Sequence, residues 1–213
     1  MTPMPIPAKI CGLTRPEDAG AAVRLGASYL GVIFAGGPRQ VTASQAKAVV
    51  EVAGQVPVFG VFSSQTRKEI LEVRDQTGIS GAQLHGEPDP ALVAGLTSAG
   101  MQVLMVIRLA GPESLPRLDL ARTLGVPALV EPRVAGRLGG AGVPLSFELA
   151  RAARERLAEH PMFLAGGLTP DTVADAVRSV RPDAVDVSSG VEQIPGIKAH
   201  DRLARFLEVL RWL

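Results

Sequence analysis

The 213-residue sequence has one cysteine, few aromatic residues and no excess of charge of either sign. A lone cysteine cannot form an internal disulfide, which favours a cytoplasmic location, and it excludes zinc sites built from cysteine clusters. The balance of 22 Lys+Arg against 21 Asp+Glu argues against nucleic acid as a partner. The sequence also lacks an apolar run of about 18 residues and a signal-peptide pattern, so we expect no membrane association.

Aromatic residues make up only 4% of the chain, so alanine, valine and leucine must supply most of the core. The 23 glycines and 17 prolines are numerous, but their share is below that typical of disordered chains. At a length suited to one globular domain, this composition favours a fold with many short connections.

Eight short apolar runs alternate with segments whose apolar residues recur at helical spacing. The runs, which we predict to be strands, are Ala8–Leu13, Tyr29–Phe34, Pro57–Phe62, Ala82–His85, Gln102–Arg108, Pro127–Glu131, Met162–Gly167 and Ala184–Gly190. The predicted helices are 15–25, 42–52, 67–77, 90–99, 115–123, 146–159, 171–180 and 200–213.

Apolar strands that alternate with helices are typical of a parallel sheet buried on both faces. Eight such units predict an α/β fold, a single-domain (β/α)8 TIM barrel over residues 1–213, with residues 1–7 as a loose lead-in. The alternative, an open doubly wound sheet, usually carries a glycine fingerprint after its first strand, which is missing here.

In such a barrel the active site lies at the carboxyl ends of the strands. Cys11 lies at the end of the first predicted strand. A lone cysteine in an apolar run is usually a small buried hydrophobic residue, but at this place its thiol would face the mouth of the barrel.

Three late turns are rich in glycine or serine and follow predicted strands six, seven and eight. Glycine lets backbone N–H groups approach an anion closely, and this type of barrel often binds phosphate between the loops after strands seven and eight. A tight turn is the ordinary explanation for any one of them, but together they predict a phosphate site. Its candidate residues are Gly140, Gly142, Gly166, Gly167, Ser188, Ser189 and Gly190.

Four further polar residues lie at or near predicted strand ends. Arg39 could pair with a carboxylate or phosphate or lie in solvent, and His85 could contact a ligand or be structural. Asp186 lies in an apolar strand, where a carboxylate is costly without a partner, so we expect it to be functional or part of a network. Glu131 closes strand six and could serve as a general acid. No metal-ligand cluster or nucleotide P-loop is present.

The chain resembles the phosphoribosylanthranilate isomerase family. The matching strings, in order along the chain, are KICGLTRPEDA, GVIFAGGPRQVT, VFGVF, GAQLHGE, GGAG followed by SFE, FLAGGL, and VDVSSGVE followed by PGIK. A string such as AGGL occurs in other phosphate-binding barrels, but the ordered set is specific.

The resemblance implies a cofactor-free Amadori rearrangement in tryptophan biosynthesis. In it, N-(5-phosphoribosyl)anthranilate becomes 1-(2-carboxyphenylamino)-1-deoxyribulose 5-phosphate. By position, Cys11 resembles the general base, Arg39 the contact to the anthranilate carboxylate, and Asp186 the residue that orients sugar hydroxyls. The glycine-rich turns resemble the family's phosphate clamp. We expect the site to lower the thiol pKa from its ordinary value of about 8.5.

Two positions depart from the family pattern. The general acid is usually an aspartate after strand six, but here Glu131 occupies that place and extends the carboxyl by one C–C bond. A misplacement of about 1 Å can cost roughly a hundredfold in rate. The loop motif reads GGAG where a hydroxyl residue is more usual. Both changes bear on catalytic efficiency.

Two alternatives stay open at this point. A different phosphate-binding barrel enzyme is one; indole-glycerol-phosphate synthase would need a catalytic lysine in a strand, and ribulose-phosphate epimerase would need metal-binding strand ends. A non-catalytic barrel that binds a phosphorylated metabolite is the other. In each case the partner is a phosphorylated small molecule, and the sequence is compatible with a monomer or a homodimer.

Overall fold

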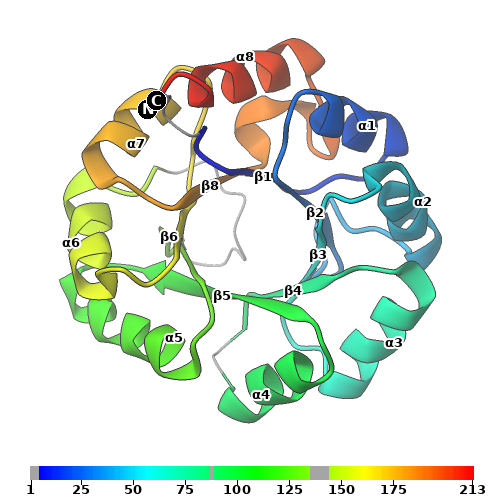
Figure 1. The fold of residues 1–213 in the computed structure, drawn as a ribbon, viewed down its shortest axis with the longest axis horizontal. Coiled ribbons are helices and arrows are strands. Elements are labelled where there is room, and N and C mark those ends of the chain that lie inside the picture. The colour runs from blue at the N-terminus through cyan, green and yellow to red at the C-terminus, as the bar shows by residue number, and fades with distance from the viewer. Residues whose placement is uncertain (1–4, 87–88, 135–143) are drawn as a thin grey trace.

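The computed structural model describes residues 5–86, 89–134 and 144–213. Eight parallel strands form a closed barrel in sequence order, and Figure 1 shows the helices as an outer ring around it. The barrel strands are β1 (Ala8–Ile10), β2 (Tyr29–Ile33), β3 (Val58–Phe62), β4 (Gly81–Leu84), β5 (Gln102–Leu109), β6 (Ala128–Pro132), β7 (Met162–Leu164) and β8 (Ala184–Val187). The predicted (β/α)8 barrel is confirmed.

The helices follow the strands one by one, and consecutive helices pack against each other. They are α1 (Pro16–Arg24), α2 (Ala43–Ala53), α3 (Arg67–Thr77), α4 (Pro90–Ser98), α5 (Leu118–Leu124), α6 (Phe147–Leu157), α7 (Val173–Val180) and α8 (His200–Leu210). Within the described ranges, no helix is long and apolar enough to cross a membrane.

Four short elements were not predicted from the sequence. A 3-10 helix, η1 (Pro112–Arg117), precedes α5, so the segment predicted as one helix is divided in two. After β8 the chain forms a second 3-10 helix, η2 (Ser189–Val191), and then an antiparallel pair, β9 (Glu192–Ile194) and β10 (Ile197–Lys198). The apolar pattern does not show this pair because its strands are only three and two residues long.

Local signals explain where several helices begin. Thr42 caps α2 and Thr66 caps α3, each in a reciprocal capping box with a Gln or Glu three residues later. The start of the chain differs from the expected loose lead-in. Residues 1–4 lie outside the described ranges, but the Ile6 N–H donates to the Leu210 carbonyl and the Pro7 carbonyl accepts from Val185. The chain is therefore hydrogen-bonded to α8 and β8 from Ile6 onward, before β1 begins.

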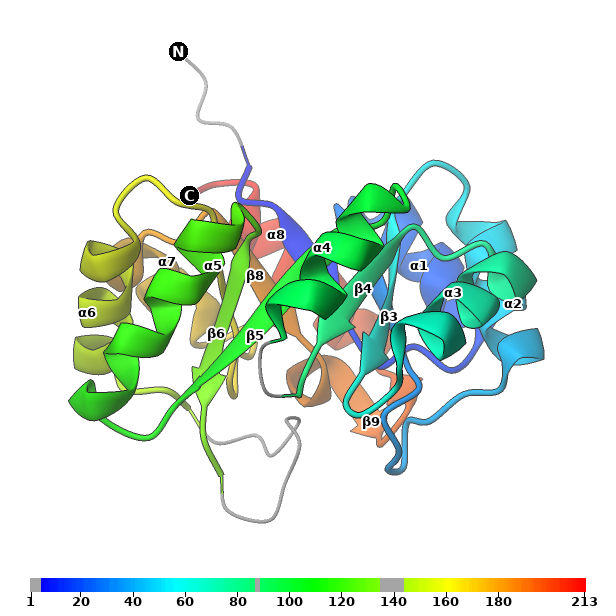
Figure 2. The same cartoon turned by 90° about the horizontal axis from the view of Figure 1, so that it is seen from below.

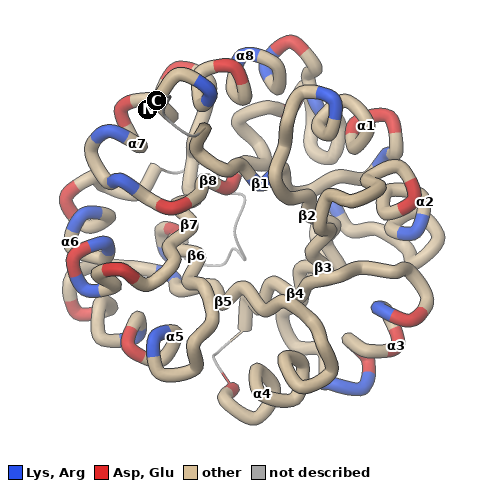
Figure 3. Tube along the Cα trace, viewed as in Figure 1, with Lys and Arg blue, Asp and Glu red and all other residues tan. Residues whose placement is uncertain are grey.

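The core has two parts. The larger part lies between the strands and the helices. Figure 3 shows that most Lys, Arg, Asp and Glu residues lie on the surrounding helices. The smaller is formed by residues of the strands themselves and Ala165, with Tyr29 packed against it through ring contacts of 6.0 Å to Phe59 and 5.4 Å to Phe163. Its members are Phe59, Leu104, Val106, Leu129, Phe163, Ala165 and Ala184. This apolar layer lines the barrel interior on its amino-terminal side.

Candidate active site

A polar layer lies above the apolar layer, toward the carboxyl ends of the strands. Because side chains on one face of a strand recur every two residues, the apolar layer is followed on the same face by charged groups: Val106 by Arg108, Leu129 by Glu131, and Ala184 by Asp186. In Figure 2 these ends point away from the two chain termini, toward the side where β9 lies. The barrel interior is therefore apolar on its amino-terminal side and lined by titratable groups at the carboxyl ends of the strands, which we call the mouth of the barrel.

Cys11 follows β1 directly and is 5% exposed. Its N–H donates to the Val187 carbonyl across the closing pair of strands, which fixes the residue at the mouth. Burial raises the pKa of the Cys11 thiol above its ordinary value, and the nearby Lys9 ammonium opposes this effect. The expected lowering of the thiol pKa is therefore not found, because desolvation outweighs the charge of Lys9.

Lys9 and Asp186 form an ion pair inside the barrel. They are register partners across β1 and β8, and Lys9 Nζ lies 2.7 Å from Asp186 Oδ1. Lys9 is fully buried, and the Asp186 side chain is 11% exposed. This pair supplies the partner that a carboxylate in an apolar strand requires.

Glu131 and His85 face each other at the mouth. Glu131 Oε1 lies 3.7 Å from His85 Nδ1, beyond hydrogen-bond length, and neither atom has a hydrogen-bond partner among the described residues. Burial, with the charge of Asp186, raises the pKa of Glu131 to about 7. Burial, with the charges of Arg108 and Lys9, lowers the pKa of His85 to about 4, so its imidazole is neutral near pH 7. Two unpartnered buried polar atoms that point into one space are typical of a ligand site.

Arg39 is part of an internal network. Its guanidinium binds the Glu192 carboxylate through Nε, at 2.9 and 3.1 Å, and through Nη2, at 2.7 Å. Lys198 Nζ donates to Glu192 Oε1 at 2.9 Å, to the Cys11 carbonyl at 2.6 Å and to the Ser188 carbonyl at 3.2 Å. A buried carboxylate with two cations thus ties the ends of β1 and β8 to the β9–β10 pair.

This network predicts a large effect of Lys198→Met on stability. Removing one partner of a buried ion pair leaves the other charge undercompensated, which typically costs about 3–5 kcal/mol. We expect the free energy of unfolding, measured by urea titration, to fall by about that amount. Lys68→Met, at an exposed position on α3, is the control and should change it by less than about 0.5 kcal/mol. A loss below about 1 kcal/mol for Lys198→Met would show that Arg39 alone satisfies Glu192.

The described parts of the predicted phosphate loops contact each other. Gly166 and Gly167 adopt positive φ angles of 102° and 64°, which only glycine adopts readily. A Cβ at Gly190 would lie 1.8 Å from the Leu168 carbonyl oxygen, so the loops after β7 and β8 pack backbone to backbone. Ser188 Oγ is buried and without a partner among the described atoms. Ser189 begins η2, while Gly140 and Gly142 lie outside the described residues.

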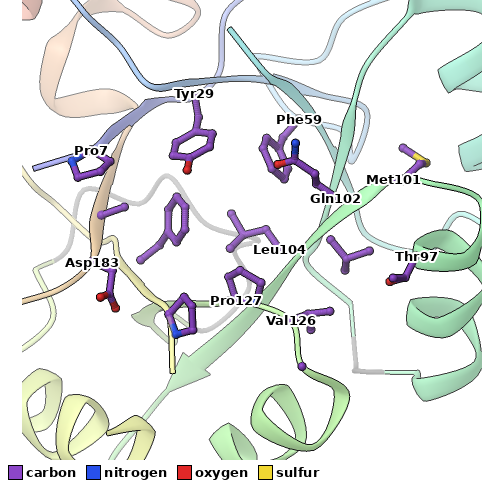
Figure 4. Close-up of a pocket in the computed structure, with 15 residues that line it drawn as sticks. Pro7, Tyr29, Phe59, Thr97, Met101, Gln102, Leu104, Val126, Pro127 and Asp183 are labelled. Atoms are coloured by element: carbon purple, nitrogen blue, oxygen red, sulfur yellow. The ribbon is translucent and has the colours of Figure 1, made fainter. Parts of the chain in front are cut away.

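A cavity of about 430 Å³ opens at the opposite, amino-terminal face of the barrel. Figure 4 shows Pro7, Pro127 and Asp183, which precede strands, around its rim, and Tyr29 and Phe59 among its lining side chains. Among the cavity's lining residues, Tyr29 and Asp183 are the titratable ones, and Asp183 is paired with Arg154 at 2.6 Å. Since none of the predicted site residues lines this cavity, we place the chemistry at the mouth.

Several residues at the mouth were missed by the sequence argument. They are Lys9, Gln83, Arg108, Glu192 and Lys198. The first three could have been found, because residues two apart in a strand point to the same face. Lys9 lies two residues before Cys11, Gln83 two before His85, and Arg108 two after Val106. The last two lie on β9 and β10, whose position relative to Cys11 no local pattern shows.

Comparison with known proteins agrees with this architecture. The family model described as N-(5'phosphoribosyl)anthranilate (PRA) isomerase matches residues 8–209. The N-(5'-phosphoribosyl)anthranilate isomerase of Symbiobacterium thermophilum is 38% identical, with 93% of this chain and 95% of the relative covered.

Solved structures lead to the same family. Phosphoribosyl anthranilate isomerase of Thermotoga maritima superposes with a TM-score of 0.87 at 31% identity, covering 98% of this chain and 100% of that one. A second structure, solved in complex with reduced 1-(o-carboxyphenylamino)-1-deoxyribulose 5-phosphate, has a TM-score of 0.84 at 30% identity, covering 98% and 100% of the two chains. The chain therefore belongs to the N-(5'-phosphoribosyl)anthranilate isomerase family.

Proposed function

We propose that this chain isomerises N-(5-phosphoribosyl)anthranilate with Cys11 as the general base and Glu131 as the general acid. The observation that carries the proposal is the pairing of two buried proton carriers at one barrel mouth, Cys11 after β1 and Glu131 on β6. A carboxyl with a pKa of about 7 holds its proton near neutral pH and can still release it, as a general acid must.

The steps balance with these two groups alone. Glu131 gives its proton to the furanose ring oxygen while the C1–O bond breaks, and the nitrogen lone pair forms the C1=N bond of a Schiff base. The Cys11 thiolate then takes the C2 proton. The C2–H electrons form the C1=C2 bond, and the C=N pair returns to nitrogen. In the last step the Cys11 thiol returns its proton to C1, and the C2 hydroxyl proton passes to the Glu131 carboxylate as the C2=O bond forms. This gives the ketone, restores both groups to their starting states and needs no cofactor.

Other residues at the mouth have the chemistry to hold a substrate with two anionic groups, a carboxylate and a phosphate. The Arg39 guanidinium, oriented by Glu192 along one edge, offers its remaining edge to the anthranilate carboxylate. Asp186 can accept hydrogen bonds from sugar hydroxyls, and the neutral His85 can accept or donate one. We assign phosphate to the backbone N–H groups of Gly166, Gly167 and the loop Ser188–Gly190, with Gly140 and Gly142 as further expected contacts.

The glutamate at the acid position is compatible with this role. Its carboxyl is one C–C bond further from the backbone than that of an aspartate, and the space it enters is bounded by His85 at 3.7 Å. We therefore expect the Glu131 carboxyl to approach the ring oxygen from a slightly different place than the carboxyl of an aspartate at this position would. This difference should lower kcat to some extent.

Complementation tests the proposed function directly. Expression of the chain in a tryptophan auxotroph that lacks the isomerase should restore growth without tryptophan. The purified protein should also remove phosphoribosylanthranilate in a fluorescence assay. Binding of the substrate without turnover would overturn the proposal in favour of a non-catalytic barrel. No binding would favour a different phosphorylated substrate. An empty vector and the Cys11→Ala chain are the matched controls.

A further inference from the structure

Lys9 is a fully buried lysine in the centre of β1, and the mechanism above gives it no task. Taking an ammonium out of water is costly, and a buried ion pair commonly gives back no more than that cost. Its pair with Asp186 therefore accounts for how the charge is tolerated, but leaves open what it does.

Gly31 on β2 shows that Lys9 and Cys11 converge. A Cβ built at Gly31 would lie 2.9 Å from Cys11 Sγ and 2.9 Å from Lys9 Nζ, so the two atoms share the space above this residue. Gly31 lies within a regular strand and has no positive φ angle, so its backbone does not require glycine. The missing side chain gives the thiol and the ammonium room to meet.

The charges that face Cys11 come from four elements. Lys9 on β1 is the strongest of those that lower the thiol pKa, and Lys198 on β10 adds to it. Asp186 on β8 raises the thiol pKa, and Arg39, after β2, also interacts with the thiolate. Lys9 also acts electrostatically on Glu131 and His85. Its charge therefore influences both proposed proton carriers, Cys11 and Glu131.

We propose that Lys9 is a positioning residue for the isomerisation: its ammonium, held in place by Asp186, is the counter-ion of the Cys11 thiolate. This inference rests on the proposed role of Cys11 as the base. Lys9 keeps its proton throughout. When the thiolate takes the C2 proton it becomes a neutral thiol. The ammonium is then balanced by Asp186 and by the Glu131 carboxylate, which gave up its proton in the earlier step.

The single cysteine makes the test clean. The rate of alkylation by iodoacetamide as a function of pH, measured on the substrate-free protein, reports the ionisation of Cys11 and no other thiol. In Lys9→Met the midpoint should rise by about 1–2 pH units, as expected for the loss of a cation in contact with the thiolate. The value of kcat should fall by about 10- to 100-fold, and more than KM rises.

Two further variants separate charge from structure. Lys9→Arg keeps the charge and should recover part of both losses. Gly31→Ala retains every charged group but occupies the shared space, so it should also raise the midpoint and lower kcat. It decides the question if Lys9→Met does not fold. Lys47→Met, at an exposed position of α2, is the matched control and should match the wild type in both measurements.

An unshifted midpoint in a folded Lys9→Met protein, or in Gly31→Ala if that variant must decide, would overturn the proposal. A shifted midpoint with unchanged kcat would overturn it as well. Failure of the proposed function shows itself separately, as absence of isomerase activity in the wild type, before any variant is made.

Discussion

Cys11→Ala should reduce kcat for phosphoribosylanthranilate isomerisation by about 10³- to 10⁴-fold, the upper part of the range for loss of a general base. KM should change little, because Cys11 lies at the end of β1 rather than among the groups proposed to bind the carboxylate or the phosphate. Steady-state kinetics with the fluorescence assay measure both constants.

Cys11→Ser is the conservative companion to this variant. A serine hydroxyl is far less acidic than a thiol and gives almost no alkoxide near pH 7, so we expect a loss nearly as large. Because cysteine is a small buried group, each variant should lose no more than about 2 kcal/mol in the free energy of unfolding. If Cys11→Ala retains a tenth of the wild-type kcat, another residue is the base.

Glu131→Gln should lower kcat by about 10²- to 10⁴-fold, since the amide cannot donate a proton to the ring oxygen. The same variant should be more stable than the wild type above pH 7. Burial raises the pKa of Glu131 from 4.5 to about 7, so its ionisation opposes folding: the protonated form's contribution is complete below pH 4.5 and is lost as the pH rises through about 7. Urea unfolding at pH 5 and pH 8 measures this difference.

The pH dependence of kcat/KM gives a second signature of Glu131. The active form needs a protonated Glu131 and an ionised Cys11, but in the free protein the thiol has the higher pKa of the two. When the pair has lost one proton, most molecules carry an ionised Glu131 and a protonated Cys11, and a small fraction carries the reverse, active arrangement. This fraction forms as the first proton leaves, so kcat/KM should rise with pH through about 7. In Glu131→Gln this limb should disappear, leaving only the later rise with ionisation of Cys11. A wild-type limb that persists in the variant would remove Glu131 from the mechanism.

The pKa of the Cys11 thiol could not be predicted from the sequence, which suggested a lowered value where the structure gives a raised one. The position of Cys11 at a strand end suggested a field that favours the thiolate. The structure buries the sulfur, and desolvation of a thiolate exceeds the attraction of one neighbouring ammonium. The extent of burial depends on how β2 and β8 pack on either side of β1, with Gly31 of β2 against the sulfur, and no local pattern in KICG reveals this.

The sequence by itself determined the order of the eight barrel strands and the eight α-helices, because apolar runs and helical periodicity are local signals and eight units leave little choice of topology. Its strand-end residues also located Cys11, His85, Glu131 and Asp186, since the carboxyl ends of parallel strands meet at one face. The single cysteine, at first a reason to exclude disulfides, was placed at this face by the argument from strand ends, and the family resemblance made it the proposed base.

Only the tertiary structure decided which groups are partners. Lys9 meets Asp186 because β1 closes the barrel against β8, 177 residues away in the chain. Arg39 and Lys198 both bind Glu192 because a short antiparallel pair folds back over the mouth. Ion pairs and desolvation depend on distances of a few ångströms between segments far apart in sequence, and such distances exist only once the barrel has closed.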